Sequence, residues 1–407
     1  MEFNKARALV VRVGTASAGS LLYAVLQAVV LRVISRSGTA DDVGLYFFAQ
    51  AIATPVAFLA GIRLRDQLAT RSNAGRLSDY LPRLALTTGI AISATAPWWF
   101  LFSTNKVALA GVGVLWANLA QAYVWAAQGT LLRQGKLMSA NTIDVAMGIT
   151  AVLSAVAGYS LLGGLHGVGV LLGASWSLLA IVTIVFAMAR DEAMSKPLPA
   201  LRDDILMGLG AMGGVGQITS ARVGAAALLG NTALAQIGSA SFLVRASLPV
   251  VNGSVRILFP KLAAAHSLSA THVLKLEARI RRALWIFVPA GSLTGATVGF
   301  FIGPQIVGIL FSTSVAPSSE TAAIVLGAAP SLYASMVYAQ LLVARRLGRS
   351  TTAMSLWSIA ATIIAVVPLS LGFGTPGAAL ALGLGYLVRT IAAERELRKA
   401  SSGTQPS

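Results

Sequence analysis

Two arginines stand inside long apolar stretches, where a charge is costly. Arg222 and Arg245 each lie within a stretch long enough to form a membrane-spanning helix. Placing such a charge in the hydrocarbon costs on the order of 3 kcal/mol, so each side chain needs a polar partner. A guanidinium presents a planar fork of donors that matches phosphate oxygens. We therefore predict that Arg222 and Arg245 line a cavity that binds a pyrophosphate group. The alternative is an arginine held by backbone carbonyls where a kinked helix meets its neighbour.

The stretch around Arg245 has one polar helical face. Its members recur at steps of four, four, three and four residues: Ser241, Arg245, Pro249, Asn252 and Arg256. This spacing places them on one side of an α-helix. Asn252 and Arg256 therefore join the predicted anion-binding wall, although Arg256 lies at the membrane edge and equally fits an ordinary cytoplasmic-side charge. Arg389 lies near the end of the last apolar stretch, and we expect its side chain to reach the aqueous surface.

Two further apolar stretches carry neutral polar stripes. One contains Asn118, Gln121, Trp125 and Gln128, and the other contains Ser20, Tyr23 and Gln27. Amides can hydrogen-bond hydroxyl groups, and the face of an indole can stack on a sugar ring. We predict substrate contacts from Asn118, Gln121, Trp125 and Gln27. Hydrogen bonding between helices, worth about 0.6 kcal/mol per contact in membranes, is the alternative.

Coupling to a proton or sodium gradient would normally use a carboxylate within the membrane. Asp144 is the one candidate near the interior of an apolar stretch. Asn141 and Asp144 stand at the start of that stretch, where an N-cap residue and a first-turn acid are favourable. The sequence therefore favours helix capping by Asp144 over ion coupling.

The composition argues against several kinds of chemistry. The chain has no cysteine, which excludes disulfides and iron–sulfur clusters. Its three histidines, His166, His266 and His272, are scattered without the spacing of metal ligands. The nucleotide-binding motif G-x-x-x-x-G-K-[ST] is missing, so ATP does not directly drive this chain. We expect no cofactor, no metal and no enzymatic activity.

The apolar composition indicates which elements position these residues. Hydrophobic residues form 56% of the 407 residues, charged residues form 11%, and the mean hydropathy is +0.75. Twelve apolar stretches, each about as long as a bilayer crossing requires, predict an all-α polytopic membrane protein. The predicted spans are 13–34, 43–62, 81–102, 107–131, 140–162, 167–189, 205–228, 233–257, 283–310, 320–343, 351–372 and 376–393.

Basic residues gather in alternate connectors and account for the net charge of +17. One set includes the N-terminus, the 63–83 connector, the 256–282 segment and the C-terminal tail. The other set holds little beyond Arg32, Arg36 and Lys106. The positive-inside rule then places both termini in the cytoplasm, which agrees with an even number of spans. We expect the phospholipid bilayer, and no nucleic acid, as a partner.

The two halves of the chain look related. A shift of 194 residues brings Pro55 onto Pro249 and several glycines onto glycines. We predict two six-helix lobes, 1–196 and 197–407, with 261–282 as the largest connector. Six spans per half would insert both halves the same way up. That is the parallel-repeat arrangement of transporters, with a substrate path between the lobes.

Short motifs follow one another in order along nearly the whole chain. They are Val43-Gly44-Leu45-Tyr46, Gly61-Ile62-Arg63-Leu64-Arg65, LLRQG at 131–135, Ala235-Gln236-Ile237-Gly238, Ile257-Leu258-Phe259-Pro260, LLVARRLGR at 341–349 and Gly374-Thr375-Pro376-Gly377-Ala378-Ala379. Their order resembles that of the O-antigen-type polysaccharide flippases in the MATE-like multidrug/oligosaccharidyl-lipid/polysaccharide exporter superfamily. The resemblance implies two six-helix lobes around a V-shaped cavity.

The resemblance also implies a function and partners. It implies that the chain moves undecaprenyl-diphosphate-linked oligosaccharides between leaflets of the bacterial inner membrane, for lipopolysaccharide or another surface polysaccharide. A polysaccharide polymerase and glycosyltransferases would work alongside it. One departure puts acid-dependent coupling in doubt: many relatives carry an acidic residue just before the arginine of span seven, and here Ser220-Ala221-Arg222 stands there.

Three other functions remain open from the sequence. A cation-coupled multidrug exporter of the same superfamily would favour acidic residues in its cavity, whereas the interior here is basic. A flippase for the peptidoglycan precursor is close, although those proteins commonly have two further spans. A membrane glycan polymerase usually needs a large outer loop, and each predicted outer connector is about ten residues or fewer.

Overall fold

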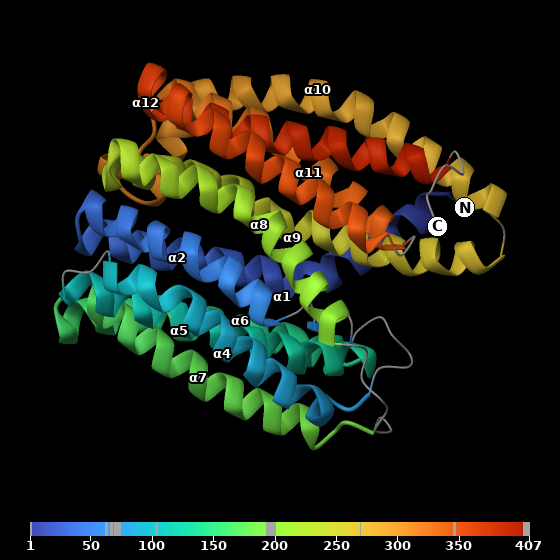
Figure 1. Cartoon of the computed structure of the whole chain (residues 1–407), viewed down its shortest axis with the longest axis horizontal. Coiled ribbons are helices and arrows are strands. Elements are labelled where there is room, and N and C mark those ends of the chain that lie inside the picture. Colours follow the sequence, from blue (N-terminus) through green and yellow to red (C-terminus); the bar gives the residue numbers. More distant parts are fainter. Residues whose placement is uncertain are drawn as a thin grey trace. The chain divides into compact units, whose positions relative to one another are not determined.

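The computed structural model describes almost the whole chain as helix. Its described residues are 2–61, 64–65, 68, 75–101, 105–192, 201–268, 270–344 and 347–401. No strand occurs in this part of the chain. Figure 1 shows the long helices that result.

The described residues of the first half form six long helices. They are α1 (Glu2–Ser37), α2 (Ala40–Gly61), α4 (Leu77–Leu101), α5 (Asn105–Arg133), α6 (Leu137–Leu162) and α7 (Leu165–Met188). Each overlaps one of the six predicted spans of this half. The turn after α6 contains Gly163 and Gly164, whose positive φ angles of 71° and 145° favour glycine. This turn lets α6 and α7 pack as neighbours.

In the second half, the part that the structure describes contains five α-helical segments and a short 3₁₀ turn. They are α8 (Leu201–Leu229), α9 (Asn231–Leu268), α10 (Ala270–Leu310), η1 (Thr313–Val315), α11 (Ser319–Ala344) and α12 (Gly348–Ser401). Gly374 interrupts α12 with φ 63° and ψ −136°, and Pro376 follows it. The kink divides α12 into two parts, which correspond to the last two predicted spans.

The predicted fold class, an all-α polytopic membrane protein, is confirmed. Among the described residues, eight helices are long and apolar enough to cross a membrane, and the merged α12 is one of them. The predicted connector at 261–282 is largely helical, since α9 continues to Leu268 and α10 begins at Ala270. A basic stretch need not be a loop, because Lys and Arg are good helix formers.

The described residues divide into two compact units. Unit 2 consists of 22–215 and 310–314, and unit 1 consists of 1–21, 216–309 and 315–407. The predicted lobe boundary between 196 and 197 falls in the segment 193–200, outside the described residues, and stays a prediction.

Each unit has its own close packing. In unit 2, α5 and α7 approach at Gly113 and Gly169, where a Cβ built on Gly113 would lie 2.2 Å from the Gly169 carbonyl carbon. Small residues permit such contact between membrane helices. In unit 1, a buried cluster joins α8, α9, α11 and α12, with Ala221, Val244, Leu332 and Tyr386 among its members.

Candidate functional site

The two predicted arginines of unit 1 lie in one neighbourhood. Arg222, on α8, has an exposed fraction of 0%. Arg245, on α9, is partly buried. The two charges act on each other, and both act on the hydroxyl of Tyr386 on α12, which is itself buried. Three helices thus bring two guanidiniums and one phenol together.

A third arginine joins this group. Arg389, three residues after Tyr386 on α12, also acts on the tyrosine hydroxyl, and its side chain is buried. The expectation that Arg389 reaches the aqueous surface is therefore wrong. Its position on the Tyr386 face of α12 is a signal that periodicity could have given, because residues three apart are neighbours on a helix. We call Arg222, Arg245, Arg389 and Tyr386 the arginine cluster.

Hydrogen bonds hold the helix that carries Arg245 against α11. The hydroxyls of Ser247 and Tyr333 bond to each other, and the Tyr333 hydroxyl donates to the Val244 carbonyl at 3.4 Å. The hydroxyl of Thr390 donates to the Ser331 carbonyl at 2.7 Å, which joins α12 to α11 beside Arg389. Hydrogen bonds to α11 therefore fix both α9, which carries Arg245, and α12, which carries Arg389.

Two predicted members of the anion-binding wall are not placed by the structure. Asn252 and Arg256 belong to helix α9, but their side chains lie outside the described residues. Their role in binding stays a prediction.

Unit 2 gathers the predicted neutral stripe. Asn118 and Gln121, on α5, are buried. The Asn118 amide donates to the Val114 carbonyl at 2.8 Å and to Gln50 Oε1 at 3.4 Å, and the Gln121 amide donates to the Tyr23 hydroxyl at 3.5 Å. These bonds match the helix-contact alternative in part, because both amides reach side chains of other helices.

The remaining two predicted sugar contacts are more open. Gln27 and Trp125 are each only half-buried. The indole of Trp125 packs on the ring of Phe58, with centroids 5.1 Å apart and planes tilted by 44°. The aromatic pair joins α5 to α2 and was not foreseen, because it depends on a contact between two distant segments.

Asp144 does not cap its helix. Helix α6 begins at Leu137 with Lys136 at the N-cap, so Asp144 lies about two turns inside. Its side chain is buried and accepts a hydrogen bond of 2.6 Å from Gln128 Nε2 on α5. The capping interpretation is wrong, because the helix starts earlier than the apolar stretch does. Asp144 also acts electrostatically on the Tyr23 hydroxyl, so it belongs to the polar interior of unit 2.

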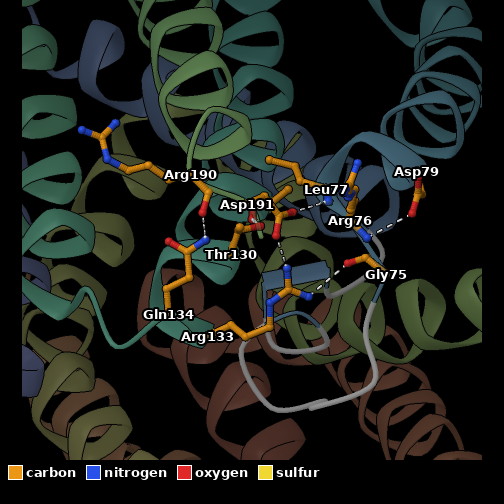
Figure 2. Close-up of polar contacts among 10 residues, drawn as sticks. Gly75, Arg76, Leu77, Asp79, Thr130, Arg133, Gln134, Arg190 and Asp191 are labelled. Carbon is orange, nitrogen blue, oxygen red and sulfur yellow. Dashed lines mark hydrogen bonds and ion pairs between the residues drawn. The ribbon is translucent and has the colours of Figure 1, made fainter. Parts of the chain in front are cut away.

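A second polar group sits where the helices of unit 2 end, and Figure 2 shows it. Arg133, at the end of α5, pairs with Asp191 just after α7 at 2.6 Å and donates to the Gly75 carbonyl at 3.0 Å. The other oxygen of Asp191 accepts from the backbone N–H of Leu77 at 2.7 Å, which starts α4. One carboxylate thus ties together the ends of three helices.

Unit 1 contains a similar carboxylate after its last span. Glu394, buried on α12, accepts from Arg281 on α10 at 3.2 Å and from Arg398 at 2.7 Å. From the sequence alone these residues look like ordinary charges of the connectors. Their pairing is not visible there, because it depends on contacts between distant segments. We assign Asp191 and Glu394 a structural role.

Comparison with solved structures shows which known fold the chain resembles. No family model matches the chain, and no curated protein matches it by sequence. An inward-facing structure of a multidrug resistance MATE family transporter of the MOP superfamily matches with a TM-score of 0.68 at 14% identity, covering 95% of this chain and 96% of that chain. An outward-facing structure of a MATE family multidrug transporter matches with a TM-score of 0.67 at 15% identity, covering 98% and 97%.

A third solved structure is a MOP superfamily transporter from Pyrococcus furiosus. It matches with a TM-score of 0.68 at 14% identity and covers 98% of this chain and 96% of that chain. The binding pocket of that protein has reverse polarity, which suggests a different function for it. The chain thus has the all-α fold of MATE transporters, and at these identities the likeness concerns the fold.

Proposed function

We propose that this chain is an alternating-access transporter that moves an undecaprenyl-diphosphate-linked oligosaccharide from the inner to the outer leaflet of the bacterial inner membrane. The observation that carries the proposal is the arginine cluster. The charges of three guanidiniums, from α8, α9 and α12, act on one buried phenol in unit 1. Such a group of positive charges favours an anion, and a diphosphate offers oxygens to more than one fork.

The distribution of carboxylates supports an anionic substrate. After residue 204 the sequence contains Glu277, Glu320, Glu394 and Glu396 as its only acidic residues. All four stand at or beyond the ends of the predicted spans, and Glu394 pairs with Arg281 and Arg398. A cationic drug would meet a repulsive interior in this half, because like charges in a low-dielectric site cost several kcal/mol.

Solved structures of the same fold support the mechanism. The fold is seen in an inward-facing and an outward-facing form in MATE family transporters, as alternating access requires. The Pyrococcus furiosus transporter suggests that a change of pocket polarity accompanies a change of function within the fold. The same reasoning favours a lipid-linked diphosphate here over a multidrug substrate, which is the main alternative. A peptidoglycan-precursor flippase and, less favoured, a glycan polymerase are the others.

Unit 2 would bind the sugar part of the substrate and the coupling ion. Half-buried Trp125 and Gln27, with Asn118 and Gln121, would contact sugar hydroxyls and ring faces. Asp144 would bind the coupling cation, because it is a buried carboxylate within a span. With both termini in the cytoplasm, the head group would enter from the side where glycosyltransferases finish it and leave toward a polymerase.

The test is a binding measurement on the purified protein in lipid nanodiscs. Undecaprenyl diphosphate should bind at least about tenfold tighter than undecaprenol, since only the first carries the anion. Arg222→Ala and Arg245→Ala should each weaken the diphosphate by about tenfold or more and leave the alcohol unchanged. Arg349→Ala is the matched control, because Arg349 is exposed on α12. Equal binding of both lipids, or tight binding of a cationic dye at the same site, would overturn the proposal.

A further inference from the structure

A buried polar clamp joins α8 to both parts of α12 in unit 1. Gln217, on α8, has an exposed fraction of 0%. Its amide nitrogen donates to the Leu382 carbonyl, in the second part of α12, at 3.1 Å. Its amide oxygen accepts from the hydroxyl of Ser358, in the first part of α12. One side chain therefore bonds to two other predicted spans and joins three spans in all.

The clamp is completed within α12. The single hydroxyl proton of Ser358 is shared between Gln217 Oε1 and the Gly385 carbonyl, which lies 2.9 Å from Ser358 Oγ, and the Thr362 hydroxyl donates to the Ser358 carbonyl at 2.9 Å. A Cβ built on Gly385 would lie 2.1 Å from Thr362 Oγ1 and 2.7 Å from Gln217 Nε2. The two parts of α12 and α8 approach this closely because residue 385 is glycine.

The two carbonyls that accept these bonds, of Leu382 and Gly385, belong to the helical turns that carry Tyr386 and Arg389. In an α-helix the carbonyl of residue i accepts from the N–H of residue i+4. The Leu382 carbonyl is thus the helical partner of Tyr386, and the Gly385 carbonyl is the helical partner of Arg389. Gln217 and Ser358 therefore hold the backbone turns from which Tyr386 and Arg389 project, and Gln217 stands five residues before Arg222.

Energy alone does not account for this arrangement. Hydrogen bonds between membrane helices contribute about 0.6 kcal/mol each on average, so the clamp adds little to stability. Its geometric effect is larger, because the break at Gly374 separates the two parts of α12 and leaves their relative position to side-chain contacts. A diphosphate can contact guanidiniums on different helices at once, so its binding depends on their separation more than that of a single phosphate does.

We propose that Gln217 and Ser358 are positioning residues that fix the spacing between Arg222 on α8 and Tyr386 with Arg389 on α12, and thereby set a preference for a diphosphate over a monophosphate. This proposal rests on the proposed function. Neither residue needs to touch the ligand. Both act through the backbone that carries the arginine cluster.

The test compares the affinities for undecaprenyl diphosphate and undecaprenyl monophosphate in nanodiscs. Ser358→Ala and Gln217→Leu should each reduce the diphosphate preference by about tenfold, mainly by weakening the diphosphate. Ser358→Thr keeps the hydroxyl and should retain most of the preference. Ser239→Ala is the matched control, because buried Ser239 also donates to a carbonyl of unit 1, that of Val315 at 2.8 Å. It should leave the preference unchanged.

The outcomes separate the two proposals. If the wild-type protein does not prefer the diphosphate to the monophosphate, the positioning role is excluded, and if it binds undecaprenol equally well the proposed function fails too. If the wild type prefers the diphosphate and the clamp variants keep that preference, only the positioning role is wrong. A lower melting temperature with an unchanged preference would count against positioning, since that is what a purely structural bond predicts.

Discussion

The two units differ in the polar residues buried within their predicted spans. In unit 2 these include amides and the carboxylate of Asp144, as the contacts of Gln121 with Tyr23 and of Gln128 with Asp144 show. In unit 1 they include the arginines whose charges act on Tyr386, while the buried carboxylate Glu394 lies beyond the last predicted span. Neutral donors and acceptors suit sugar hydroxyls, and a buried carboxylate suits a cation. Under the proposed function, this difference would divide the work between the units: unit 1 would bind the anion and unit 2 the remaining groups.

The units agree, however, in how their helix ends are tied. Asp191 and Glu394 each follow the last span of a half, and each bonds to the helix that forms the third span of that half. The buried polar residues within the spans differ between the units, whereas a carboxylate that bonds to a neighbouring helix occurs after the last span of each. We therefore expect the residues within the spans to determine substrate binding, and Asp191 and Glu394 to determine stability.

Reversing one charge of the arginine cluster should have the largest effect. Arg222→Glu places a carboxylate beside Arg245 and where the anion would bind, which should weaken undecaprenyl diphosphate by about a thousandfold, or about 4 kcal/mol. Arg222→Lys keeps the charge without the planar fork and should lose only about tenfold. Isothermal titration in nanodiscs measures both. Equal losses for the two variants would mean that Arg222 is needed for folding rather than for binding.

Breaking the tie in unit 2 should reduce stability rather than binding. Asp191→Asn removes the charge that pairs with Arg133, and the side chains are 4% and 15% exposed. Loss of one partner of a mostly buried pair should lower the free energy of unfolding by about 3 kcal/mol. Lys399→Ala, which breaks the exposed pair with Glu396, should cost less than about 1 kcal/mol. Thermal unfolding in detergent measures the difference, and similar losses in both variants would contradict it.

Neutralising the carboxylate of unit 2 should abolish coupling but spare the anion site. Asp144→Asn preserves an oxygen that can accept from Gln128 Nε2. Transport driven by an ion gradient should fall to the background rate, while undecaprenyl diphosphate binding stays within about twofold of wild type. Gln134→Ala, at the end of α5, serves as the control. Gradient-driven transport that survives Asp144→Asn would remove this residue from the coupling site.

The smallest effect is expected at the half-buried indole. Trp125→Leu removes an aromatic face that packs on Phe58. It should reduce the preference for a sugar-bearing lipid diphosphate over the bare lipid diphosphate by about fivefold, or about 1 kcal/mol. A preference that does not change would favour the alternative, in which Trp125 only packs between α5 and α2.

Much of the fold was predictable because the bilayer imposes a length on each helix. The apolar stretches located the helices, and Gly374 with Pro376 marked the break in α12. The helical form of the 261–282 connector was not anticipated, because a charged segment between spans has no apolar period that reports its conformation. Asp144 was misplaced because the apolar stretch starts later than the helix does, three residues after Leu137.

Less of the candidate site was predictable. Arg222 and Arg245 were noticeable because a charge in an apolar stretch is rare. Arg389 was assigned to the surface because it lies near the end of the last apolar stretch, and burial by other helices is not visible in that position. The Gln217 clamp joins residues 141 and 165 positions apart, and no local pattern reports such a contact.

Translocation by the purified protein tests the central claim most directly. Proteoliposomes would carry undecaprenyl-diphosphate-linked oligosaccharide, and the fraction of sugar accessible to an added glycosidase would be followed over time. We predict that the wild-type protein moves the lipid across the bilayer and that the double variant Arg222→Ala, Arg245→Ala does not. Equal translocation by both proteins, or export of a cationic dye without movement of the lipid, would contradict the assignment of the arginine cluster to a diphosphate.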